Sequence, residues 1–185
     1  MTQNSPVCAQ DVLDFWFKEL GPEQHFVKDE ALDADIAARF GATLQAAARG
    51  ELGSWRATAG GRLAEIIVLD QFSRNIHRGH AEAFANDVVA LVLAQELIRG
   101  AHDSELPIEQ RAFAYMPLMH SESLAIHARA EVLFDQPGLE GNLEFERKHQ
   151  AVLQRFGRYP HRNAALGRTS TPEEKEYLAQ PGSGF

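Results

Sequence analysis

Apolar residues recur at intervals of three and four positions along most of the chain, and no convincing two-residue alternation interrupts them. This spacing places apolar side chains on one face of an α-helix and is not that of a β-strand. The sequence therefore predicts an all-α fold of about eight helices. The predicted helices occupy residues 11–20, 30–50, 60–76, 81–100, 107–120, 123–134, 143–157 and 171–180.

Turn residues separate these helices and keep the connections short. Gly50 and Gly157 are expected to close two of them, and Thr171 and Glu174 have the spacing of a capping box that opens the last one. Short connections favour antiparallel helix pairs within a single all-helical domain that spans residues 1–185. Two architectures fit, a compact helical bundle or a tetratricopeptide-like right-handed superhelix, and no recurring motif decides between them.

Bulk composition is that of a globular protein. The chain has 185 residues, of which 44% are hydrophobic and 24% are charged, and no apolar run approaches the length of about 18 residues that a membrane span needs. Its first ten residues lack the features of a signal peptide, and Cys8 is the single cysteine. A cytoplasmic protein without membrane contact, disulfide, metal or other cofactor is predicted.

The formal net charge of −8 argues against binding to nucleic acid or to anionic membranes, but one stretch departs from this average. Between positions 147 and 168 six residues are basic and none is acidic. Guanidinium groups bind phosphate and carboxylate through paired hydrogen bonds, so this stretch either holds an anion or pairs with buried acids from elsewhere. The six residues are Arg147, Lys148, Arg155, Arg158, Arg162 and Arg168.

A carboxylate interrupts one of the predicted apolar faces. Leu63, Ile66 and Ile67 define the inward face of their helix, and Asp70 is the next residue on it. Burying an unpaired charge is costly, so Asp70 is predicted to be buried and paired with Arg74, four residues on. The pair is either a structural lock or, together with Asn75, part of a pocket wall.

Further polar residues occur near expected helix breaks. Pro117 is expected to kink or end its helix, which brings His120 and Glu122 to a position that either lines a site or caps the next helix from Ser121. His149 shares a face with Phe145, Val152 and Phe156, and a lone histidine there is more typical of a satisfied core residue than of a ligand.

The stretch "RFGRYPHRNAALGR", residues 155–168, projects several of the basic side chains from one turn. Pro160 restrains the chain there, so Arg158, His161, Arg162 and Asn163 are expected to point from a stiffened turn. Asp70 neutralises only about one arginine. If no other buried acid pairs with the remaining arginines, binding of an external anion is the simpler explanation.

The segments "VLDFWF", "LDQFSRNIHRG", "AFANDVVAL", "YMPLMHSES" and "RFGRYPHRNAALGRTSTPEE" together resemble a bacterial family of unknown function. Its signatures usually read LDQFPRN and RFGRFPHRN, and this chain departs from the first of them at Ser73, where proline is usual. The resemblance covers nearly the whole chain. It implies an all-helical, tetratricopeptide-like fold, with a less rigid bend after Phe72, and it implies no catalytic residue.

Phosphate-loop, dinucleotide-binding, serine-hydrolase and zinc-protease motifs are absent, so the sequence names no reaction and leaves an enzymatic role open. The leading hypothesis is a polar site that binds a small phosphate- or carboxylate-bearing ligand, with His120 or His161 as the acid or base of any chemistry. The alternative is a helical-repeat module that binds a peptide or protein and uses its arginines structurally. The predicted site residues are Asp70, Arg74, Asn75, His120, Glu122, Arg158, His161, Arg162 and Asn163.

Overall fold

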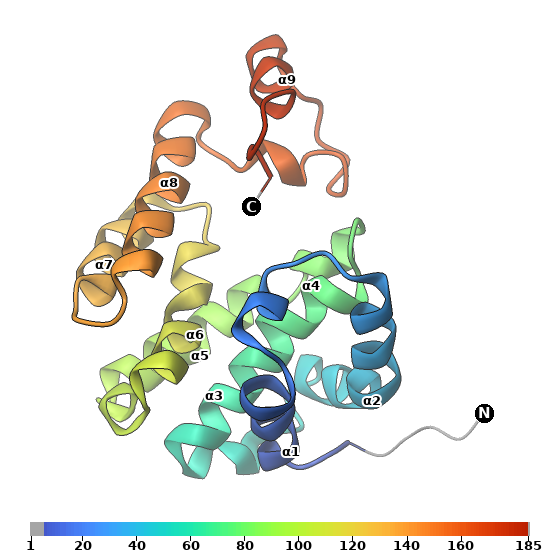
Figure 1. Ribbon diagram of the computed structural model, residues 1–185, viewed down its shortest axis with the longest axis vertical. Helices are drawn as coiled ribbons and strands as arrows, with labels where there is room; N and C mark the ends of the chain where they lie inside the picture. The colour runs from blue at the N-terminus through green and yellow to red at the C-terminus, as the bar shows by residue number, and fades with distance from the viewer. Residues whose placement is uncertain (1–5, 185) are drawn as a thin grey trace.

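The computed structural model describes residues 6–184, and its regular elements are all helical (Figure 1). No strand occurs among these residues, which confirms the all-α prediction. The α-helices are α1 (Ala9–Asp14), α2 (Glu30–Ala48), α3 (Ala59–Ile67), α4 (Ser73–Ile76), α5 (Asp87–Arg99), α6 (Ile108–Met119), α7 (Leu124–Phe134), α8 (Glu140–Phe156) and α9 (Pro172–Leu178).

Two π-helical turns extend these elements. One, Phe15–Glu19, continues α1, and the other, Val68–Phe72, joins α3 to α4 so that the chain stays helical from Ala59 to Ile76. Short 3₁₀ turns lie at Pro22–His25, Gly53–Ala57, Ala81–Phe84, His102–Glu105 and Pro160–Arg162.

The prediction of a single helix over residues 81–100 is wrong, because the chain forms a 3₁₀ turn at Ala81–Phe84 before α5 begins at Asp87. Asn86 precedes α5, and asparagine favours the start of a helix over its interior.

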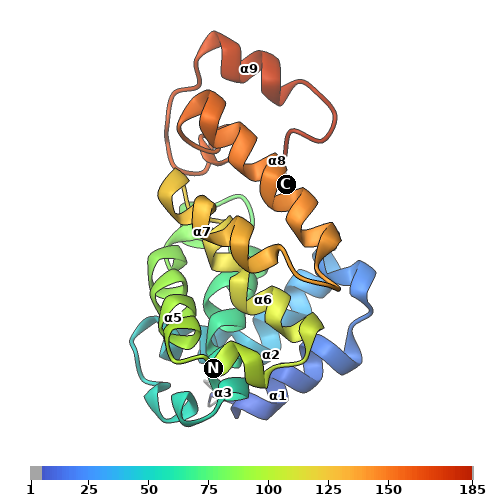
Figure 2. The ribbon, with the colours of Figure 1, turned by 90° about the vertical axis from the view of Figure 1, so that its left-hand side faces the viewer.

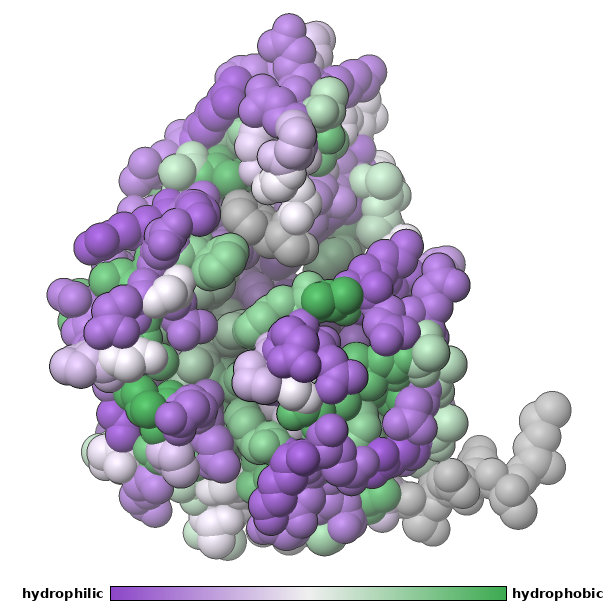
Figure 3. All heavy atoms as spheres, in the orientation of Figure 1, coloured by the Kyte–Doolittle hydropathy of each residue, from purple (hydrophilic) through white to green (hydrophobic). Residues whose placement is uncertain are grey.

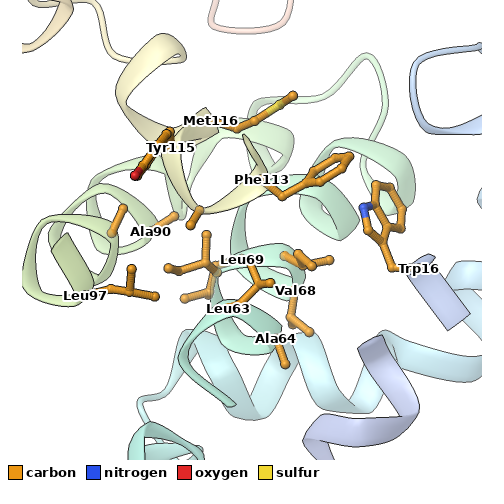
Figure 4. Packing of buried hydrophobic residues seen from close by; sticks show 14 of the residues in the cluster. Trp16, Leu63, Ala64, Val68, Leu69, Ala90, Leu97, Phe113, Tyr115 and Met116 are labelled. Atoms are coloured by element: carbon orange, nitrogen blue, oxygen red, sulfur yellow. The ribbon is translucent and has the colours of Figure 1, made fainter. Parts of the chain in front are cut away.

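The helical segment from α3 to α4 forms the centre of the molecule. Every residue from Leu63 to Ser73 is buried, because α1, α2, α5 and α6 pack around this segment (Figure 4). The one inward stripe predicted from the sequence is therefore too narrow, since a helix enclosed on all sides buries residues on all of its faces. Glu65 and Asp70 are the carboxylates within it, and each needs a partner.

Consecutive helices pack against each other from α5 through α8, and α9 lies beyond α8 at one end of the molecule (Figure 2). This arrangement is a compact helical bundle, while the tetratricopeptide-like superhelix stays a prediction. A smaller hydrophobic cluster of Val152, Leu153 and Tyr159, with Phe156 and Tyr177 at its edge, connects α8 to α9.

Three local expectations meet different outcomes. Pro117 lies within α6, which ends two residues later, as predicted. Ser123, not Ser121, is the residue that precedes α7. Phe145 is 53% exposed instead of buried with Val152, and Lys148 Nζ lies 4.9 Å from its ring centre.

No helix of the described region has the length and apolarity needed to cross a bilayer.

Candidate functional site

A cavity of about 240 Å³ lies where the α3–α4 segment, the end of α6, the middle of α8 and the turn at Pro160–Arg162 meet. Figure 3 shows that the molecule is hollowed on this face, between the end that carries α9 and the part that carries α2 and α4. The cavity is lined by His25, Phe26, Val27, Gln71, Arg74, Asn75, Arg78, Gly79, Ala83, Phe84, Met116, His120, His149, His161 and Arg162.

Local backbone features bring these side chains together. The π-helical turn holds Asp70 and Gln71, and such turns recur at functional sites. His120 occupies the C-terminal cap of α6, just after the turn that contains Pro117. Pro160 opens the 3₁₀ turn that carries His161 and Arg162. Segments far apart in the sequence thus meet at one cavity.

Asp70 lies directly behind the cavity wall and is 1% exposed. Its Oδ1 is 3.0 Å from Arg74 Nη1 and 2.8 Å from His120 Nδ1, and its Oδ2 accepts a hydrogen bond of 2.5 Å from Gln71 Nε2. The predicted burial of Asp70 and its pairing with Arg74 are therefore confirmed. The contact with His120 joins a second predicted site residue to this pair.

The charges around Asp70 shift its pKa and that of His120. Burial opposes ionisation of Asp70 most strongly, but Arg74 and then His120 outweigh it, so the pKa of Asp70 lies far below its ordinary value. Burial, reinforced by the nearby Arg74, lowers the pKa of His120. A carboxylate only accepts hydrogen bonds, so a neutral His120 must carry its proton on Nδ1.

Arg74 and Arg162 share one carboxylate on the other side of the cavity. Arg74 donates to both oxygens of Asp87, at 2.9 and 3.1 Å, and Arg162 Nη1 donates to Asp87 Oδ2 at 3.0 Å. Arg162 Nη2 donates to the carbonyl of His120 at 2.8 Å. Asp70, Arg74, Asp87 and Arg162 therefore form one chain of alternating charges.

Of the two arginines in this row of charges, Arg162 is the less fully compensated. Its side chain is 7% exposed, and its buried Nε has no hydrogen-bond partner within the described part of the chain. Burial and then repulsion from Arg74 lower the pKa of Arg162, and Asp87 and Glu122 offset only part of this effect. The guanidinium also lies 4.7 Å from the ring centres of both Phe84 and Tyr159.

Besides His25 and His120, two further histidines line the cavity. Burial lowers the pKa of His149 to about 3 and that of His161 to about 4, and Arg162 adds to the effect on His161. His149 Nδ1 is 2.8 Å from the carbonyl of Phe145. The centre of the Tyr159 ring lies 5.6 Å from that of His149 and 5.5 Å from that of His161. The sequence interpretation of His149 as a satisfied core histidine recognised its burial but missed that it faces a cavity.

Besides Asp70, three predicted site residues lie outside the lining, in contacts that fasten the C-terminal segment. Arg158 donates to both oxygens of Glu174 at 2.7 and 2.8 Å, and Asn163 Nδ2 is 3.3 Å from the same carboxylate. Glu122 accepts from both terminal nitrogens of Arg168 and from the backbone of Tyr159. Asn75, which does line the cavity, donates to Asp33 of α2 at 2.7 Å.

All six basic residues of the acid-free stretch meet an acidic side chain. The sequence analysis favoured an external anion only if no other acid met these residues, and that condition is not fulfilled. Five of the six pair with residues at least 16 positions away in sequence. The excess of positive charge in this stretch therefore does not by itself indicate a bound anion. The argument now depends on the incomplete compensation of Arg162.

Replacing Glu174 by alanine is expected to loosen α9 without affecting the cavity. The change removes the partner of Arg158 and the capping box that starts α9. Hydrogen–deuterium exchange should become faster in α9 and stay unchanged in α3 and α6. Faster exchange throughout the chain would contradict this local role.

The cavity offers no evident metal site, since the described residues contain no group of three or more His, Cys, Asp or Glu side chains arranged to hold an ion. Sequence reasoning also missed the lining residues Gln71, Arg78 and Phe84. Gln71 directly follows Asp70 and Arg78 comes three residues after Asn75, so closeness in sequence to predicted site residues was the available signal.

Comparison with known proteins gives the family of the chain. A model for bacterial proteins of unknown function (DUF924) matches residues 12–182. The chain belongs to this family. A solved structure of a protein of unknown function from Agrobacterium tumefaciens is 42% identical, with a TM-score of 0.88 over 92% of this chain and 96% of the other. No curated protein matches. The family membership suggested by the sequence signatures is thus confirmed, and the DUF924 description adds no activity.

Proposed function

We propose that this DUF924 protein binds a small molecule carrying a phosphate or carboxylate group in the cavity beside Arg162. One observation carries the proposal. Arg162 is a buried guanidinium that lines the cavity. Among the described residues, Asp87 is its only acidic partner and is shared with Arg74, and its Nε has no hydrogen-bond partner. An incompletely compensated buried cation is stabilised by an added anion, because burying a charge is costly unless it is paired.

The rest of the lining sets the size and polarity of the ligand. A volume of about 240 Å³ is below the usual range for drug-sized ligands, so the ligand is a small metabolite. Met116, Phe84 and Phe26 supply apolar surface for its body, and His120, His149 and His161 supply hydrogen bonds. The peptide-binding alternative draws on no comparable observation in this cavity.

Thermal-shift measurements with phosphorylated and carboxylated metabolites test the proposal. Ligand at about a hundred times its dissociation constant stabilises the native state by about 2.7 kcal/mol. For a chain of this length each kcal/mol is worth about 2–4 °C, so the melting temperature should rise by about 5–11 °C. The rise should shrink strongly in Arg162→Lys, which keeps the charge but loses the planar fork.

Arg155→Ala is the matched control. Arg155 belongs to the same basic stretch, but it pairs on the surface with Glu173, 2.8 Å away, and does not line the cavity. Its ligand-induced shift should equal that of wild type. Each variant is compared with and without ligand, so a loss of intrinsic stability does not affect the result. If no anion shifts wild type, or if Arg162→Lys responds fully, the proposal is wrong.

A further inference from the structure

The contact between Asp70 and His120 fixes which ring nitrogen of His120 can act as a base. Asp70 Oδ1 accepts a hydrogen bond from the protonated Nδ1, so the free lone pair of the neutral ring lies on Nε2. Nε2 has no hydrogen-bond partner among the described residues, and His120 lines the cavity. This is the orientation that lets a histidine remove a proton from a bound reactant.

The cation and the base lie next to each other. Arg162 Nη2 donates to the main-chain oxygen of the same His120 residue at 2.8 Å. Arg162 and His120 both line the cavity, so a small ligand that contacts Arg162 shares the cavity with the base. Donors placed where negative charge develops are among the strongest contributors to catalysis of acyl transfer.

The lining also indicates the nucleophile. None of the described residues that line the cavity is a serine, threonine or cysteine. The described lining therefore lacks a hydroxyl or thiol nucleophile, and solvent water is the nucleophile that a histidine base would activate.

We propose, building on the anion-binding function above, that the cavity hydrolyses small carboxylic esters, with His120 as general base and Asp70 as the residue that positions it. His120 Nε2 takes a proton from water while the water oxygen bonds to the ester carbonyl carbon. Arg162 stabilises the resulting oxyanion. The bond to the alkoxy oxygen then breaks, the alkoxy oxygen takes the proton back from His120, and a carboxylic acid and an alcohol leave.

The products agree with the binding function, because the acid formed is a small carboxylate. The test uses the full chain with 4-nitrophenyl acetate, monomethyl succinate and small lactones, and follows release of 4-nitrophenol or acid. Wild type should hydrolyse at least one ester faster than buffer. His120→Ala should lower kcat/KM by about 100-fold or more, the usual contribution of a general base.

Two further measurements separate catalysis from folding. Added imidazole should restore part of the rate of His120→Ala, which a structural defect would not allow. Asp70→Asn should lower kcat and move the acidic limb of the pH–rate profile to lower pH, because a negative charge that favours protonated His120 is lost. A purely structural role of Asp70 would lower the rate without moving that limb.

His80→Ala is the control, because His80 is exposed and lies outside the cavity lining, and its rate should equal that of wild type. The hydrolase proposal is overturned if wild type is no faster than buffer on every ester, or if His120→Ala retains the full rate. In either case a thermal shift of wild type with succinate or inorganic phosphate would leave the binding proposal standing. Absence of both activity and shift would overturn the two proposals together.

Discussion

Asp70→Ala is expected to lower the free energy of unfolding by about 3–5 kcal/mol, the usual cost of removing one partner from a buried ion pair. The variant leaves Arg74 with Asp87 alone, a carboxylate that Arg162 also uses, and it removes the acceptor of Gln71 and His120. For a chain of this size the loss corresponds to a fall of about 6–20 °C in melting temperature. Urea denaturation followed by circular dichroism measures it.

The matched control is Asp35→Ala. Asp35 is also an acidic partner of an arginine four residues on, but its side chain is 52% exposed and lies 3.5 Å from Arg39. Its loss should stay below about 0.5 kcal/mol, as is usual for surface substitutions. If Asp70→Ala were as mild as Asp35→Ala, the buried charge chain would not contribute to stability.

Stability is expected to fall between about pH 7.5 and pH 5 because buried histidines of the cavity resist protonation. In the unfolded chain histidine binds a proton near pH 6.5, whereas the folded state keeps His149 neutral down to about pH 3 and His161 down to about pH 4. The unfolded state therefore binds more protons in this window, and folding free energy is lost as the pH falls.

The expected size of this effect is about 2 kcal/mol for His149 and up to about 2 kcal/mol for the partly exposed His161, since each pH unit below 6.5 is worth about 1.36 kcal/mol. Denaturant unfolding at a series of pH values measures it. A double variant, His149→Gln with His161→Gln, should lose most of the dependence, whereas His80→Gln should keep it. An unfolding free energy that is flat from pH 7.5 to pH 5 in wild type would show that these rings protonate freely when folded.

The parts of the site that follow from local spacing could be predicted from the sequence. Asp70 continues an apolar face and Arg74 follows four residues later, so their burial and pairing needed no tertiary information. Pro117 and Pro160 likewise marked the places where His120, His161 and Arg162 leave regular helix. These features depend on helix geometry, which acts over a few residues.

The parts that depend on distant contacts could not be predicted. Asp87 meets Arg162 across 75 positions of sequence, and Glu174 meets Arg158 across 16, so no local pattern showed that the arginines were already paired. The π-helical turn at Val68–Phe72 leaves no clear mark in the apolar spacing. Phe145 was assigned to the core because its face was judged from helical period alone, without the neighbours that leave it exposed.

A crystal structure of the protein soaked with succinate or inorganic phosphate tests the central claim most directly. The account predicts an anion inside the cavity, within hydrogen-bond distance of Arg162 and beside His120 and His161. In crystals of Arg162→Lys soaked in the same way, that density should be weak or absent. Anions bound only at surface lysines and arginines, with solvent alone beside Arg162, would contradict the account.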